Sequence, residues 1–269
     1  MNRRATGSLS LVCLSAAACL VPEDAKPEVG LLVQGASKFV HRGITNVDNP
    51  VLQPRLALAL PTVHGDRIGV AVEGNMDLRN DTGGAWFPDG HAGRFTQIEA
   101  IVDYTKTFGD VTVRAGVHNY NLPNGLEFPN GERGATSEVF VLVSANVLEA
   151  TPYFSWHYDF DEVRAPYYRA GITESFALSE DFTLILDGSL GYATSAQSAW
   201  LYGLDESGFA DLRGKAEIAY QYDPRTTVLA GVHGSAIVDS GIDRWFRDIA
   251  PQGIDDDPIW FTLGIAWAF

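Results

Sequence analysis

The sequence Ile-Trp-Phe-Thr-Leu-Gly-Ile-Ala-Trp-Ala-Phe, residues Ile259 to Phe269, decides the fold. Large apolar side chains recur at every second position, at Ile259, Phe261, Leu263, Ile265, Trp267 and Phe269. The opposite face carries Thr262, Gly264, Ala266 and Ala268. A strand of about 9–11 residues that is apolar on one face, with aromatic residues at its ends, is typical of a transmembrane β-strand. A half-buried edge strand of a soluble sandwich is the alternative.

The aromatic end of this segment, Phe269, resembles the C-terminal signal of bacterial outer-membrane β-barrels. In those proteins the barrel-assembly machinery reads the signal. The resemblance implies that the same machinery is a partner of this chain, through its C-terminal strand, and that outer-membrane lipid surrounds the folded protein.

Composition narrows the class of protein. The chain has 269 residues, 27 of them Gly, and a formal net charge of −15. Its mean hydropathy is near zero, as expected when lumen-facing and lipid-facing residues alternate, and no long stretch has a helical period. The acidic balance argues against nucleic acid, because phosphates require clustered Lys and Arg. No nucleotide-binding motif and no His/Glu metal pair is present, so we expect neither a cofactor nor a metal nor enzymatic activity.

The first 25 residues have the pattern of a secretory signal peptide. A positive start, Met1–Arg4, precedes a short apolar run, Leu9–Leu20, and a cluster of small residues. Cleavage after Ala18 or after Ala25 fits this pattern. Both cysteines, Cys13 and Cys19, lie in this region, so no disulfide scaffold is expected, and an acylated Cys19 is an alternative start of the mature chain. We therefore divide the chain into a signal peptide, 1–25, and one barrel, 26–269.

From Pro27 onward, period-2 patterns and turn residues predict about twelve strands joined alternately by short and long connections. Most of these strands are longer than the 5–6 residues usual in soluble sandwiches. Strands of this length in hairpins, with short turns on one side and long loops on the other, favour a closed antiparallel outer-membrane β-barrel with both termini on the periplasmic side. The predicted strands are 29–40, 51–60, 68–78, 95–107, 111–120, 137–146, 152–160, 167–178, 182–193, 209–222, 226–238 and 259–269.

Aromatic residues near the strand ends suit the two interfacial girdles of such a barrel. They are Trp156, Tyr158, Tyr168, Phe182, Tyr192, Tyr220, Tyr222, Trp260 and Trp267.

One motif lies between the first two predicted strands. It reads Ser37-Lys-Phe-Val-His-Arg-Gly-Ile-Thr45, followed by Asp48-Asn-Pro50 and Gln53. This stretch resembles the Ser-x-aromatic-x-x-Arg-Gly pattern of the TorF-like porin family of proteobacteria. His41 and the Pro54–Arg55 pair depart from the usual pattern of that family. The resemblance implies an outer-membrane pore. The MltA-interacting protein family shares the architecture and implies instead a scaffold for enzymes that act on peptidoglycan.

The polar faces of the predicted strands supply the residues expected to line the lumen. Glu138, Asp159 and Asp211 lie on the same faces. The candidate pore-lining residues are Lys38, Arg55, Glu73, Asp77, Glu99, Asp103, Arg114, His118, His157, Arg169, Asp187, Arg213, Lys215, Glu217 and His233.

Charges of both signs inside a barrel either line a water-filled pore or pair across strands and plug it. A barrel of about twelve strands lies between filled eight-stranded barrels and open sixteen-stranded porins, so both alternatives stay open. We expect passive diffusion of small polar solutes through a monomer or small oligomer, with a non-conducting scaffold as the alternative. Arg42 and Gly43 are placed at the rim, where Arg42 is expected to form a structural ion pair rather than to bind solute.

A membrane hydrolase is the third class of function. Ser155, His157 and Asp159 share one face of a predicted strand, but their order differs from the His-x-Ser of outer-membrane phospholipase A. The bulky apolar residues beside them would face lipid, so Ser155 and His157 would face the lumen, out of reach of a lipid substrate. The acidic run Asp255–Asp257 lacks the ligand spacing of a Ca²⁺ loop and is expected to be a surface loop.

Overall fold

A computed structural model describes residues 26–79, 92–124, 134–147, 149–248 and 257–269. The predicted signal peptide and Asp255–Asp256 lie outside these ranges, so their interpretation stays a prediction. Within them, no helix has both the length and the apolar character needed to span a membrane.

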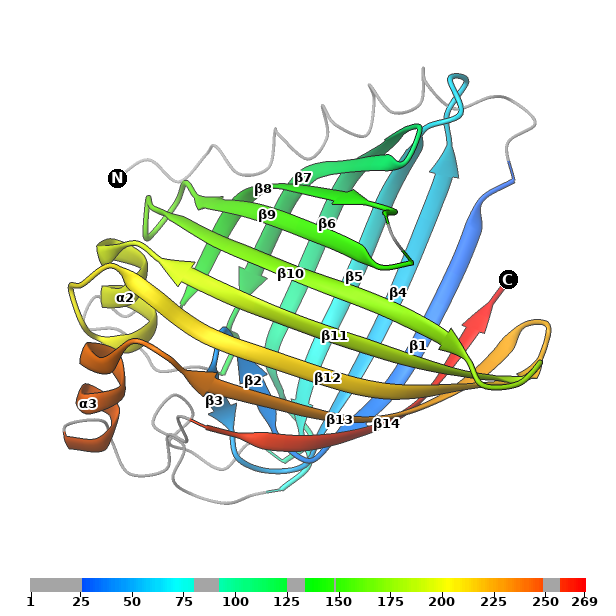
Figure 1. The fold of residues 1–269 in the computed structure, drawn as a ribbon. Coiled ribbons are helices and arrows are strands. Elements are labelled where there is room, and N and C mark those ends of the chain that lie inside the picture. The colour runs from blue at the N-terminus through cyan, green and yellow to red at the C-terminus, as the bar shows by residue number, and fades with distance from the viewer. Residues whose placement is uncertain (1–25, 80–91, 125–133, 148, 249–256) are drawn as a thin grey trace.

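Twelve strands form a closed antiparallel barrel, as predicted (Figure 1). Each pairs with its neighbours along the chain, and β1 pairs with both β4 and β14, which closes the cylinder. Closure leaves no unpaired edge, and this is what a sheet requires in hydrocarbon. The barrel strands are β1 (Glu28–Ala36), β4 (Val51–Pro61), β5 (Arg67–Asp77), β6 (Phe95–Phe108), β7 (Val111–Asn121), β8 (Ala135–Ala145), β9 (Thr151–Asp159), β10 (Pro166–Ala177), β11 (Phe182–Ala193), β12 (Gly208–Asp223), β13 (Thr226–Ile237) and β14 (Ile259–Ala268).

The last strand shows how the period-2 pattern sorts side chains. In β14, Phe261 and Leu263 are 63% and 65% exposed, whereas Trp260 and Thr262 are only 6% and 8% exposed. The large apolar side chains therefore point outward, opposite to their place in a soluble sandwich, where they would be buried between sheets. Exposed large apolar side chains recur on the outer faces of every barrel strand from β4 to β14, so the exterior fits a bilayer.

The aromatic residues on the outer face gather near the strand ends. At the end with the long loops, Tyr192 lies between Tyr168 and Phe209, with ring centroids 6.2 Å and 5.5 Å apart. At the other end Phe182 stacks on Tyr220. Trp260, however, was wrongly assigned to a girdle. It points into the barrel, because it follows the outward-facing Ile259, and its ring stacks on His233 at 5.1 Å.

The first strand differs from its predicted range. It ends at Ala36 rather than at residue 40, and the following residues form a separate hairpin of β2 (Phe39–His41) and β3 (Ile44–Val47). Arg42 and Gly43 make its turn, with φ of 48° and 85°. The hairpin carries apolar side chains that form a buried cluster with the barrel wall. Its members are Ala36, Phe39, Val40, Val47, Val51 and Trp260.

Two of the long connections contain short helices, α2 (Ser195–Tyr202) and α3 (Ser240–Asp248). Figure 1 shows them at the same end of the barrel as β2 and β3. Gly203, with φ of 73°, ends α2 in the left-handed conformation that favours glycine. A buried cluster joins the helices, the hairpin and the wall, and it consists of Ile44, Tyr167, Ala193, Leu201, Tyr202, Ala210, Ile237 and Ile242.

Candidate functional site

The tip of the β2–β3 hairpin crosses the lumen. Arg42 donates from Nη2 to both carboxylate oxygens of Glu138 on β8, at 2.7 Å each. The side chains of this ion pair are only 9% and 2% exposed. Since β8 lies four strands along the wall from β4, the hairpin reaches across the barrel rather than lining its rim. Arg42 therefore forms a buried ion pair close to the strand ends that carry the long loops.

Three further contacts fix the hairpin tip. The Tyr202 hydroxyl of α2 donates to the Arg42 carbonyl oxygen at 2.8 Å. The Arg42 guanidinium lies over the Tyr167 ring, 4.4 Å from its centroid. Gly43 fits so closely against the wall that an added Cβ would lie 2.7 Å from Cβ of Asp211 and 2.9 Å from Cδ1 of Ile237. A side chain at position 43 would thus be both conformationally strained and sterically blocked.

The strand pairing places the predicted pore-lining residues. Directly paired residues in a sheet point to the same face, and so do residues two apart in one strand. Glu138, which meets the hairpin inside the barrel, pairs with His118 and Asp159. The same pairing can be followed from strand to strand round the barrel. It places fourteen of the fifteen candidate pore-lining residues, from Arg55 to His233, on the inner face. Lys38 lies instead between β1 and β2, where it pairs with Asp48 at 3.0 Å.

Most of the inner charges form ion pairs along the wall. Arg169 and Asp211 are 2.7 Å apart, and this carboxylate is fully buried. The remaining pairs are Arg55–Glu73 at 3.1 Å, Arg114–Asp103 at 2.7 Å, His118–Glu99 at 2.6 Å and Lys215–Glu217 at 3.4 Å. Arg213 is an exception among the described residues, because it forms no ion pair and instead lies over the Trp260 ring at 5.8 Å.

Ser155, His157 and Asp159 do share the inner face, yet they do not form a catalytic relay. His157 Nδ1 lies 3.3 Å from Glu138 Oε2, and among the described residues no hydrogen bond joins the His157 ring to the Ser155 hydroxyl. Asp159 accepts hydrogen bonds from the Thr136 hydroxyl and from backbone N–H groups of the loop after β9. The described geometry therefore lacks the serine–histidine–carboxylate chain that activates a nucleophile.

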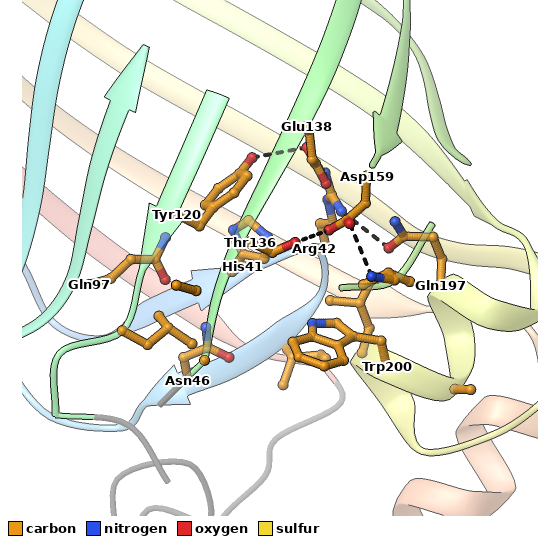
Figure 2. Close-up of a pocket in the computed structure, with 17 residues that line it drawn as sticks. His41, Arg42, Asn46, Gln97, Tyr120, Thr136, Glu138, Asp159, Gln197 and Trp200 are labelled. Carbon is orange, nitrogen blue, oxygen red and sulfur yellow. Dashed lines mark hydrogen bonds and ion pairs between the residues drawn. The ribbon is translucent and has the colours of Figure 1, made fainter. Parts of the chain in front are cut away.

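A cavity of about 300 Å³ lies between the hairpin, β6 to β9 and α2, on the side of the long loops (Figure 2). His41, Arg42 and Asn46 of the hairpin form one part of its lining. Figure 2 shows Gln97 and Tyr120 on one side of this space and Trp200 on another.

Several residues of this site were missed in the sequence. Gln197 accepts from Arg42 at 3.4 Å and donates to the Ala165 carbonyl at 3.0 Å, and Tyr202 holds the hairpin turn. Both belong to a short helix in a loop that gave no periodic signal. The one available clue was the Arg42–Gly43 pair in the quoted motif, which marked the hairpin tip but not its partners.

No known protein family matches the chain, and no curated relative matches it. Among solved structures, the NanC porin is similar with a TM-score of 0.52 at 14% identity, over 88% of this chain and 98% of that one. The KdgM porin gives a TM-score of 0.49 at 10% identity, over 90% and 99%.

The fold is that of a porin-like outer-membrane β-barrel. The likeness to NanC bears on the fold alone, and the outward apolar faces and the closed sheet place the barrel in a bilayer. The closer resemblance to the TorF-like family stays a prediction.

Proposed function

We propose that the protein is an outer-membrane channel for passive diffusion of small polar solutes, narrowed by the β2–β3 hairpin. The observation that carries the proposal is the contrast between the two faces of the barrel. Outer positions such as Leu263 are apolar and exposed, whereas inner positions carry charges on every barrel strand from β4 to β12. Polar side chains on the inner face of a barrel are typical of water-filled channels.

The pairing of the inner charges bears on selectivity. Most inner carboxylates lie beside a cation, so a passing ion meets ion pairs with little net charge. Strong ion selectivity comes instead from rings of side chains that all carry the same charge. The proposed solutes are therefore selected mainly by size. The hairpin sets this size, because its tip spans from the β4 side to β8 and β12.

We also propose that the chain belongs among the TorF-like porins, a proposal that the motif at residues 37–53 supports. Its Arg-Gly pair forms the tip that narrows the lumen. We also propose that the barrel-assembly machinery recognises the C-terminal strand. In the folded barrel Phe269 donates its backbone N–H to the Val29 carbonyl oxygen at 2.9 Å, so the terminal residue takes part in closure.

Single-channel recording in planar bilayers tests the function. The wild-type barrel is expected to give small conductance steps. A variant in which residues 38–49 are replaced by a short Gly-Ser turn is expected to give larger steps, because the hairpin no longer crosses the lumen. If both proteins fold and neither conducts, the channel proposal fails, and the non-conducting scaffold becomes the better interpretation.

A further inference from the structure

The cavity on the outer side of the hairpin has charged groups in its wall, but each of them already has an ion-pair partner or several hydrogen-bond donors. Arg42 and Glu138 form the buried ion pair described above. Asp159 accepts from the Thr136 hydroxyl and, at 3.0 Å each, from the backbone N–H groups of Asp161 and Val163. A charged ligand in this space would lose its hydration without meeting a free counter-ion, which is unfavourable.

Neutral hydrogen-bonding groups, in contrast, remain available in the wall. The Asn46 amide has no hydrogen-bond partner among the residues that the structure describes, and the His41 ring makes only an edge contact with the Tyr120 ring there, at 5.6 Å. Gln97 donates its amide N–H to Glu99, which leaves its carbonyl oxygen without a described donor. Two amides and an imidazole offer both donors and acceptors, as hydroxyl groups require.

Aromatic rings complete the lining. Trp200 is partly buried against the cluster around α2 and borders the cavity. Figure 2 shows Trp200 and Asn46 in the lower part of the view and Tyr120 in the upper part, with the cavity that all three line between them. Ligand sites typically combine aromatic walls with a few polar groups that fix orientation. The volume of about 300 Å³ is at the small end of the range for ligand sites, roughly 300–1,000 Å³.

We propose that this cavity is a binding site for an uncharged, hydroxyl-rich solute of monosaccharide size, held on the outer side of the hairpin before passage. The proposal rests on the proposed channel function, since it names the class of solute that the channel admits. The amides of Asn46 and Gln97 hydrogen-bond the hydroxyl groups, and the C–H face of the sugar ring packs on Trp200. Because the Arg42–Glu138 pair forms the adjacent wall, the bound solute contacts the element that narrows the lumen.

Isothermal titration of the detergent-solubilised full barrel tests this site. The probes are D-glucose, D-gluconate and D-glucosamine, which have similar size and differ in charge. Glucose is expected to bind, and both charged probes at least about tenfold more weakly, because the wall offers them no free counter-ion. Equal or tighter binding of gluconate or glucosamine, or no binding of glucose, would overturn the proposal.

Matched variants locate the site. Gln97→Met removes the amide with little change in size and is expected to weaken glucose binding about three- to tenfold. Gln53→Met is the control, since Gln53 lies on the same inner face, bonds to Asn75 at 3.0 Å and does not line the cavity. Asn46→Ala gives a second test that leaves the Gln97–Glu99 contact intact. If the Gln53 variant loses as much affinity as the other two, the assignment of the site is wrong.

Conductance of the same preparations separates this inference from the function on which it rests. A barrel that conducts but binds no glucose refutes the binding site alone. A barrel that binds glucose as expected but never conducts refutes the channel and leaves the site standing.

Discussion

The Arg42–Glu138 ion pair makes the sharpest prediction. Replacing Arg42 by Met leaves the Glu138 carboxylate buried without its main cation. Removing one partner of a buried pair typically costs about 3–5 kcal/mol. At about 1.4 kcal/mol per tenfold, the ratio of docked to undocked hairpin should fall by a factor of roughly one hundred to a few thousand. The apolar cluster around Phe39 and Val47 remains and keeps the base of the hairpin in place.

The assay is single-channel recording, supported by maleimide labelling of an Ile44→Cys reporter in residues 26–269. Ile44 lies beside Gly43 at the hairpin tip and is 2% exposed, so labelling reports undocking of the tip. Arg42→Met is expected to show frequent large openings and faster labelling than the wild type. Arg55→Met is the matched control, because the Arg55–Glu73 side chains are 41% and 30% exposed and such pairs contribute only about 0.2–1 kcal/mol.

A double variant tests the cause. Arg42→Met with Glu138→Leu replaces the pair by apolar side chains, which is often close to neutral, so it should return the channel toward wild-type behaviour. If Arg42→Met is as closed and as poorly labelled as the wild type, the ion pair does not hold the hairpin, and the reasoning is refuted.

Three other predictions follow from the same geometry. Gly43→Ala should undock the hairpin and raise the conductance, because the new Cβ would collide with β12 and β13. Gly65→Ala is the control and should leave the conductance unchanged, because Gly65 has a similar φ of 80° but no atom within 4 Å of an added Cβ. Leu263→Arg on the outer face should lower the free energy of unfolding by about 2–4 kcal/mol, measured by urea titration in lipid vesicles. Gln34→Arg is the control and should cost much less, because the side chain of residue 34 points into the lumen. Burial and then the neighbouring arginine lower the pKa of His41 from 6.5 to about 3. The undocked hairpin therefore binds a proton at His41 more readily than the docked hairpin does. The free energy of docking is most favourable above pH 6.5 and becomes less favourable as the pH falls toward 3. At pH 5 the loss is about 2 kcal/mol. Openings should become more frequent on acidification, and a His41→Gln variant that shows the same pH dependence would contradict this cause.

The barrel was predictable because its signal is local and repeated. In β5, for example, Val70 and Val72 alternate with Glu73 and Asn75, and the same period recurs in each hairpin. Turn residues then set the strand ends to within about three residues. The exception is β1, where the apolar residues Phe39 and Val40 continue the pattern beyond Ala36. Periodicity cannot tell whether an apolar face meets lipid or the inside of the barrel.

The site was less predictable because its contacts join distant parts of the chain. Glu138 carried no local sign that its partner would be Arg42, 96 residues earlier. The helix that supplies Gln197 and Tyr202 has only eight residues, too few for a clear periodic pattern. Arg42–Gly43 was recognisable only through the motif, which gave no sign that the hairpin folds inward across the lumen.

The inward hairpin also bears on how the protein is built. Its residues are made early, directly after the first strand, but the groups that hold Arg42 and Gly43 belong to β8, α2 and β12, which follow much later. A partly inserted sheet offers the guanidinium no carboxylate, so the hairpin stays hydrated until most of the wall exists. The hairpin can therefore dock only when the barrel is nearly complete. In a chain whose folding stops before β12, the β2–β3 hairpin would remain undocked and exposed to water.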